Sequence, residues 1–430
     1  MKLFLIFFQL AWCDPFEESY KMVKFGPKEE LGQLLFFDKI LSGNKNISCA
    51  TCHNPMNFTG DALSLPVGEG GEGFGAARTT GTLNKIIRRV PRNSPPLYNL
   101  GHSSINFLFL DGRLEKDESY PSGVKTPLEF ELPERLDGLL AAQAFFPVIN
   151  IDEMAGQKGE NLVADLVSAN NFLEVYRVLT QRLRENQEYV ELFKKAFPEY
   201  VKGPEDLRFI FVANALASFQ IAAFSTLNSP YDKYLEGDQN SISDSAKRGM
   251  AIFNGKAKCI LCHSGVLQTD NNFHAIATPQ IGPGKGHGEK GFEDFGRQGI
   301  TKDTIDRYKF KTPSLRNVAL TGPYGHSGAY TSLRDMVLHH LNPGLMLKNY
   351  TLKKAFLPSR VDLDKLDDVA MKDPDTISDL LSANELPRVF LSDNEVDDLL
   401  DFLYSLTDPK VFKFSNLIPK RVPSGLPLAD

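Results

Sequence analysis

The pattern Cys-x-x-Cys-His occurs twice in this chain, as CATCH at residues 49–53 and as CILCH at residues 259–263. Two thiols one helical turn apart can each form a thioether with a vinyl group of the same porphyrin. The histidine that follows can then turn a ring nitrogen onto the iron. The repeat therefore predicts two covalently attached haems, each enclosed by helices of its own.

The two motifs define two attachment pairs and two proximal iron ligands. They are Cys49, Cys52 and His53 for the first haem, and Cys259, Cys262 and His263 for the second. A structural zinc site needs four ligands, whereas each motif supplies three and the motifs lie far apart. A thioredoxin-like redox pair needs no histidine after the second cysteine. Haem attachment is thus the interpretation that uses every residue of both motifs.

The first twenty residues read as an export leader. Lys2 is followed by an apolar run that ends at Trp12, which is too short to span a bilayer but suits a signal peptide. Leu10 to Cys13 resemble a loose lipoprotein cleavage box, in which Cys13 would carry a lipid anchor. Plain secretion and a buried N-terminal helix are the alternatives. We therefore expect the periplasm or cell envelope of a bacterium.

Length and hydrophobic periodicity predict a mainly α protein with long loops and little strand. The 430 residues suffice for two or three domains, and 42% of them are hydrophobic. We expect residues 1–20 to be the leader, 21–227 a first haem domain and 228–430 a second. Ser392 and Glu395 form a capping box at the start of a well-marked final helix. The net charge of −6 argues against nucleic acid as a partner.

Several stretches taken together resemble the bacterial di-haem cytochrome c peroxidases, a family that also contains MauG-like enzymes. They are LGQLLFFDKILSGNKNISCATCHNP, PRNSPPLYN, DGR, LAAQAFFPV with DEM, YDKYLEGD and FKTPSLRNVALTGPYGHSGAYTSLRDMV, in the order of the family. The resemblance implies two cytochrome c-like domains with a calcium ion between them. It also implies a peroxidatic first haem, and a second haem that takes electrons from a small cytochrome c or a cupredoxin. A homodimer is compatible with it.

The resemblance assigns further site residues by position. Glu153 of DEM and Gln143 of LAAQ would line the distal pocket of the first haem, where a carboxylate can move the proton that O–O cleavage requires. Asn93 would bind calcium through its side chain, and Thr321 and Pro323 through their carbonyl oxygens. Without the family motifs, Glu153 would read as a surface charge and Asn93 as a turn residue.

The sequence departs from the family pattern at both irons. Family members place the sixth ligand of the second haem, often Met or Tyr, 17 residues after the proline that corresponds to Pro323. That position here is His340, so we expect a bis-histidine haem, with His339 and then Met336 as the next candidates. No histidine lies between His53 and His102, so the first iron should keep an open sixth site; His102 is the remaining candidate for a blocking ligand.

The residue before Asp-Gly-Arg is the third departure. The family usually has tryptophan there, between the haems, but this chain has Leu110, and its only tryptophan is Trp12 in the leader. Electrons would then have to tunnel directly between the haems or use a nearby tyrosine.

Three functions remain open on the sequence. The first is a peroxidase that reduces hydrogen peroxide with electrons from a small redox protein. The second is a MauG-like oxidase of a protein or another organic substrate, and the third a non-catalytic di-haem electron carrier or sensor.

Overall fold

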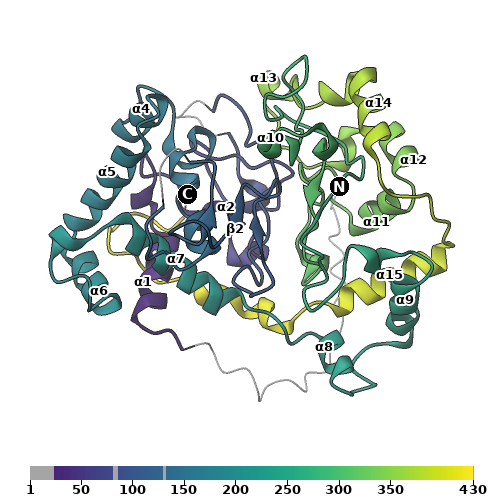
Figure 1. Ribbon diagram of the computed structural model, residues 1–430, viewed down its shortest axis with the longest axis horizontal. Helices are drawn as coiled ribbons and strands as arrows, with labels where there is room; N and C mark the ends of the chain where they lie inside the picture. Colours follow the sequence, from purple (N-terminus) through teal and green to yellow (C-terminus); the bar gives the residue numbers. More distant parts are fainter. Residues whose placement is uncertain (1–23, 81–85, 129–131, 430) are drawn as a thin grey trace, which may run out of the picture.

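The computed structural model describes residues 24–80, 86–128 and 132–429. The predicted leader, with Trp12 and Cys13, lies outside them. Two mainly helical lobes lie side by side (Figure 1), so the predicted mainly α fold with little strand is confirmed. Within the described part of the chain, no helix is both long and apolar enough to cross a membrane.

The first lobe is built from the N-terminal half of the chain. Its helices are α1 (Pro27–Phe37), α2 (Cys49–Cys52), α3 (Leu139–Gln143), α4 (Leu162–Ser168), α5 (Phe172–Arg184), α6 (Gln187–Ala196) and α7 (Phe209–Phe224). A small antiparallel sheet joins β1 (Phe107–Leu108), β2 (Leu114–Lys116) and β3 (Val124–Lys125) in that order. Helix α7 is apolar on nearly every side because it runs through the middle of this lobe's core.

The second lobe repeats the plan with shorter elements. Its helices are α8 (Pro230–Leu235), α9 (Asp244–Asn254), α10 (Gln298–Thr301), α11 (Leu333–Leu341), α12 (Pro343–Lys348), α13 (Val361–Asp364), α14 (Pro374–Ala383) and α15 (Asp393–Ser405). Strands β4 (Phe273–His274) and β5 (Phe310–Lys311) form an antiparallel pair. The capping box of Ser392 and Glu395 opens α15, as the sequence predicted.

In each lobe the helix before the haem motif crosses the last helix of the lobe at a glycine. A Cβ on Gly32 of α1 would lie 1.9 Å from the carbonyl oxygen of Ala215 in α7. A Cβ on Gly249 of α9 would likewise lie 1.9 Å from the carbonyl oxygen of Asp398 in α15. Only a residue without a side chain permits such an approach. The two lobes therefore repeat one helix crossing, and each crossing directs the chain into a haem motif.

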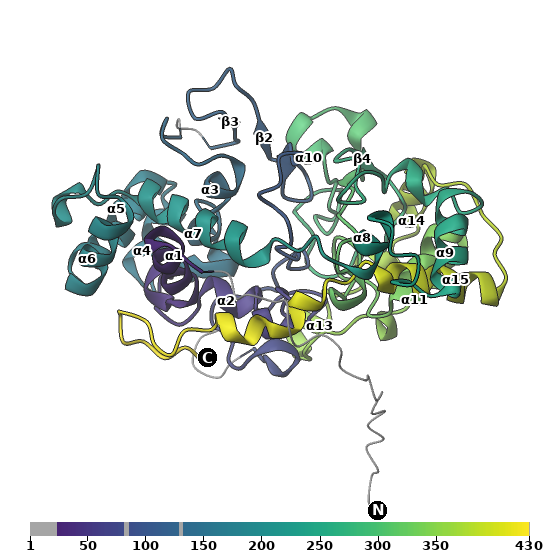
Figure 2. The same ribbon diagram turned by 90° about the horizontal axis from the view of Figure 1, so that it is seen from below.

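The end of the chain returns to the first lobe. After α15 the chain runs beneath α1 and α2 (Figure 2), where Val411, Phe414 and Leu417 join the core of the first lobe. Ser424 donates a hydrogen bond of 2.7 Å to the buried carboxylate of Asp38. The predicted division at residue 228 follows the order of the chain, whereas in space the last residues complete the first lobe.

Candidate haem and peroxide site

The first haem motif lies on α2, a single helical turn that brings Cys49 and Cys52 to one side. His53 follows at the end of this turn, and its Nδ1 lies 3.2 Å from the carbonyl oxygen of Thr59. Because a carbonyl can only accept, Nδ1 carries the proton and Nε2 keeps its lone pair. Burial lowers the pKa of His53, which favours the neutral imidazole that binds iron.

The second motif forms a short 3₁₀ turn, Cys259–Leu261, after Lys258 in the left-handed conformation. The Nδ1 of His263 lies 3.1 Å from the carbonyl oxygen of Gln268, so this ring also keeps Nε2 free as an acceptor. Burial, and secondarily the nearby His340, lower the pKa of His263 to about 4. The histidines of both motifs are thus oriented by a hydrogen bond to a backbone carbonyl, as iron-binding imidazoles commonly are.

His340 faces His263 across a gap of the size that an iron ion requires. The ring centres lie 6.3 Å apart, and Nδ1 of His340 lies 2.9 Å from the carbonyl oxygen of Met336. An imidazole nitrogen binds a first-row metal at about 2.0 Å and lies about 1.1 Å from its ring centre, so two axial rings have centres about 6 Å apart. The three free Nε2 atoms of His53, His263 and His340 therefore fit two haem irons.

His339, the second candidate from the sequence, uses both ring nitrogens elsewhere. Its Nδ1 lies 3.0 Å from the hydroxyl of Tyr330, and its Nε2 lies 2.7 Å from the carbonyl oxygen of Ile276. No lone pair remains for a metal. The third candidate, Met336, supplies the carbonyl that orients His340.

A cavity of about 430 Å³ opens in the first lobe. Its wall is formed by Phe109, Arg113, Phe146, Ile149, Asn150, Ile151, Glu153, Val167, Ser168, Asn170 and Phe172. Among these described wall residues, none carries an imidazole, thioether, thiol, phenol or amine that could bind iron. Several of them pack against the same core as Cys49 and Cys52. The described wall therefore combines apolar and polar side chains with one carboxylate, and contains no histidine, methionine or cysteine.

Glu153 lies on a single π-helical turn, Ile151–Ala155. Its carboxylate accepts a hydrogen bond of 2.6 Å from Nδ2 of Asn150. Burial raises the pKa of Glu153, while the charges of Arg113 and Lys285 oppose that rise. A buried carboxyl group whose pKa is raised holds a proton more readily than an exposed one, which suits a group that must accept a proton and return it. Sequence reasoning identified Glu153 but missed Asn150, which no quoted motif contains, and gave no role to Arg113, although the DGR motif ends on it.

Two other predicted residues lie away from this cavity. Gln143 ends α3 and is not among the described residues of the wall, so its distal role stays a prediction. His102 lies in a turn, where Nδ1 is 2.8 Å from the hydroxyl of Ser104, and it does not line the cavity either.

The Gly-rich segment 66–80 is held against the same turn as Glu153. The guanidinium of Arg78 donates to the carbonyl oxygens of Val67, Gly68 and Gly73 at 2.5, 2.8 and 2.9 Å. A Cβ on Gly68 would lie 1.8 Å from the carbonyl oxygen of Asp152. This glycine-rich segment, which contains no histidine, therefore packs backbone to backbone against the turn that carries Glu153.

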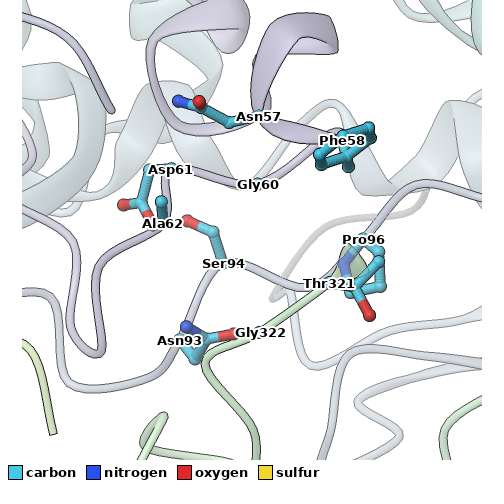
Figure 3. A pocket seen from close by; sticks show the side chains of 10 residues that line it. All are labelled: Asn57, Phe58, Gly60, Asp61, Ala62, Asn93, Ser94, Pro96, Thr321 and Gly322. Atoms are coloured by element: carbon cyan, nitrogen blue, oxygen red, sulfur yellow. The ribbon is translucent and has the colours of Figure 1, made fainter. Parts of the chain in front are cut away.

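The predicted calcium residues surround a second cavity, of about 10 Å³ (Figure 3). Asn93 and Thr321 line it, as does Gly322, the neighbour of Pro323. The amide nitrogen of Asn93 donates to Leu63 and Ser64, which leaves its oxygen available. The volume is that of one water-sized particle.

Asp61 also lines this small cavity, and no sequence motif identifies it. One of its carboxylate oxygens is buried without a hydrogen-bond partner. Burial raises the pKa of Asp61 to about 7. Oδ1 of Asp61 accepts from the backbone N–H of Leu63, so its other oxygen, beside the free amide oxygen of Asn93, is a hard donor that fits a calcium ion.

Leu110 lies where the two lobes meet. Its carbonyl oxygen accepts a hydrogen bond of 2.8 Å from the backbone N–H of Lys311 in β5. Next to it, Arg92 joins Asp111 of the first lobe to Asp294 of the second at 2.7 and 2.6 Å. The backbone here crosses directly between the lobes, but an aliphatic side chain stands at the position of the usual tryptophan.

Comparison of the sequence with protein families places the chain in a known family. The model described as di-haem cytochrome c peroxidase matches residues 26–240. The methylamine utilization protein MauG of Methylorubrum extorquens is 33% identical over 319 residues, which cover 74% of this chain and 69% of that protein. The cytochrome c551 peroxidase of Pseudomonas aeruginosa is 30% identical over 338 residues, which cover 78% and 75%.

Two solved structures share the fold over nearly the whole chain. One is a MauG-like protein associated with microbial copper homeostasis, with a TM-score of 0.58 and 24% identity, covering 95% of this chain and 98% of that one. The other is the diheme peroxidase BthA of Burkholderia thailandensis, with a TM-score of 0.57 and 20% identity, covering 95% and 92%. At these identities the likeness concerns the fold.

Proposed function

This chain belongs to the di-haem cytochrome c peroxidase family, and we propose that it reduces hydrogen peroxide to water with electrons from a small redox protein. We place this activity in the periplasm or envelope of a bacterium. The two haems would be held by Cys49, Cys52 and His53, and by Cys259, Cys262, His263 and His340.

The observation that carries the proposal is the difference between the two histidine sites. His263 and His340 face each other, which suits a haem closed on both sides. The described wall of the cavity beside Glu153 contains no imidazole, thioether or thiol that could close the first haem. A closed haem suits electron transfer and an open one suits binding of an oxidant, so the asymmetry favours catalysis over a simple electron carrier.

Bound haem would supply the iron and the electrons for O–O cleavage. Glu153 would take the proton from one peroxide oxygen and return it to the other, which then leaves as water. The amide of Asn150 would orient this carboxylate. Removing the electron-donating protein should stop turnover, while Glu153 would still assist a single reaction with peroxide.

Electron paramagnetic resonance of the oxidised holoprotein, with steady-state peroxide reduction, tests this function. We expect one high-spin signal, one bis-imidazole low-spin signal, and peroxide reduction that depends on a reduced small cytochrome c. Two low-spin signals without peroxide turnover would instead favour a carrier or sensor.

The two haem motifs differ in exposure, which supports electron entry at the second haem. Between the cysteines of the first motif, Thr51 is only 2% exposed, whereas Leu261 in the second is 72% exposed. Ile260 and Val266 are exposed beside it. A small apolar surface over one haem edge is what a cytochrome or cupredoxin with an apolar contact face would use.

Leu261→Asp is therefore expected to lower kcat/KM for the reduced donor about tenfold, equal to about 1.4 kcal/mol. Burying a carboxylate in an apolar contact is unfavourable. Stopped-flow reduction of the second haem by dithionite, which needs no docking, should be unchanged. Leu235→Asp in α8, another exposed leucine, is the control, and an equal loss in both variants would contradict the docking site.

We also propose that calcium occupies the small cavity, bound by oxygens of Asn93, Asp61, Thr321 and the segment ending at Pro323. Its cavity joins residues of both lobes, so the ion would hold the lobes in register. The unpaired oxygen of Asp61 is the feature that most needs a cation.

Asp61→Asn should weaken calcium binding by about 10–100-fold, since it removes the charged donor of the proposed set. Isothermal titration of calcium-free holoprotein measures the effect. Asp117→Asn in an exposed turn serves as the control. Equal affinity in wild type and Asp61→Asn would exclude Asp61 as a ligand.

Oxidation of a protein or organic substrate is the second candidate, because relatives named MauG are as similar as those named peroxidases. Mass spectrometry of candidate substrates after peroxide treatment separates the two. Oxidation products of a candidate substrate that form without a reduced electron donor would favour the oxidase over the peroxidase.

A further inference from the structure

Tyr330 and His339 form a hydrogen-bonded pair that the proposed peroxidase reaction does not use. Both side chains are 0% exposed. The hydroxyl of Tyr330 lies 3.0 Å from Nδ1 of His339, and Nε2 of His339 lies 2.7 Å from the carbonyl oxygen of Ile276. The pair stands immediately beside His340 on α11.

These contacts settle the direction of both hydrogen bonds. The carbonyl of Ile276 can only accept, so Nε2 of His339 carries the ring proton. A neutral imidazole then has its lone pair on Nδ1, and the phenol of Tyr330 must donate to it. Tyr330 is therefore a phenol already bonded to a base, with no water needed to receive its proton.

The pair is also in ring contact with the proposed ligand of the second haem. The ring centres of Tyr330 and His339 lie 5.4 Å apart, and those of His339 and His340 lie 6.4 Å apart. No tryptophan occurs among the described residues, and Leu110 occupies the usual position between the lobes. Tyr330 is thus an oxidisable side chain with a fixed base next to the second haem.

We propose, on the basis of the function proposed above, that Tyr330 is a redox site that supplies one electron to the haem pair. Reduction of one hydrogen peroxide to two waters would take two electrons from this pair and two protons from solvent. One electron then passes from Tyr330 to the haem pair, and the phenolic proton passes to Nδ1 of His339. Tyr330 becomes a neutral radical and His339 becomes an imidazolium. The N–H at Nε2 of this imidazolium still donates its hydrogen bond to the carbonyl oxygen of Ile276. Two electrons from the donor protein would then restore the starting state: one reduces the tyrosyl radical, which takes its proton back from His339, and the other replaces the electron still missing from the haem pair.

Tyr350 provides a comparison within the same cluster. Its ring centre lies 5.6 Å from that of Tyr330, but its hydroxyl donates to the carbonyl oxygen of Ala329 at 2.9 Å. A carbonyl oxygen is a far weaker base than the ring nitrogen of an imidazole, so oxidation of Tyr350 would leave its proton without a comparable acceptor. Burial raises the pKa of both phenols, so neither ionises without oxidation.

The test is rapid-freeze electron paramagnetic resonance of oxidised holoprotein mixed with one equivalent of hydrogen peroxide, without an electron donor. We expect a tyrosyl signal that narrows when the protein contains ring-deuterated tyrosine. Tyr330→Phe should reduce this signal more than tenfold, whereas Tyr350→Phe should retain it. The bis-imidazole signal before mixing verifies that each variant is folded around its second haem.

A tyrosyl signal that persists in Tyr330→Phe would overturn the proposal. In the wild type, electron–nuclear double resonance with ¹⁵N-histidine should detect a histidine nitrogen coupled to the radical, and its absence would also overturn it. Peroxide consumption without any tyrosyl radical would overturn this inference alone. Failure to consume peroxide would overturn the proposed function, and the inference with it.

Discussion

Glu153→Gln is expected to lower kcat for peroxide reduction by about 10²–10⁴-fold, the range for loss of a positioned acid–base group. Glutamine keeps the shape of the side chain and an oxygen that can still accept from Asn150. It cannot take a proton from one peroxide oxygen and return it to the other. The loss should therefore fall on the chemical step, with both haem spectra unchanged.

The pH dependence provides a second measure of the same residue. Glu153 must be deprotonated to accept the proton, and burial raises its pKa. The activity of the wild type should therefore fall as the pH drops through a value above that of an ordinary glutamate. Glu153→Gln should lose this acid limb.

The control for Glu153 is Glu160→Gln, an exposed glutamate on the same loop, which should remain within about twofold of wild type. Single-turnover mixing with peroxide distinguishes a slow chemical step from slow delivery of electrons. An unchanged rate and pH profile in Glu153→Gln would mean that another group moves the proton.

The second large effect is expected in His340→Met, which should replace the bis-imidazole signal by that of a histidine–methionine haem. The reduction potential of the second haem should rise, because thioether ligation favours ferrous iron. The first haem should keep its high-spin signal. Electron paramagnetic resonance measures the change of signal, and a potentiometric titration of the second haem measures the change of reduction potential.

His339→Gln is the matched control, since the neighbouring ring makes two hydrogen bonds and has no lone pair left for iron. It should keep the bis-imidazole signal. Retention of that signal in His340→Met, together with its loss in His339→Gln, would reverse the assignment of the ligand.

Much of this molecule follows from short-range chemistry. Cys49, Cys52 and His53 lie within five residues, so the pattern alone specifies thioether attachment and a proximal ligand. The helix that begins after Ser392 was equally predictable, because capping and a period of 3.6 residues are local properties. The glycine at position 32 would have been read only as a helix-weakening residue, since its partner Ala215 is remote in sequence.

The choice between His339 and His340 required the folded chain. Both are adjacent imidazoles, and what separates them is Ile276 and Tyr330, which meet His339 from other segments. The unpaired oxygen of Asp61, and the hydrogen bond from the Arg78 guanidinium to the carbonyl oxygen of Gly68, likewise arise only from packing. Covalent attachment and helix formation depend on neighbours along the chain. The lone pairs left for a metal, and the groups that are buried, depend on contacts between distant segments, whose geometry no local pattern encodes.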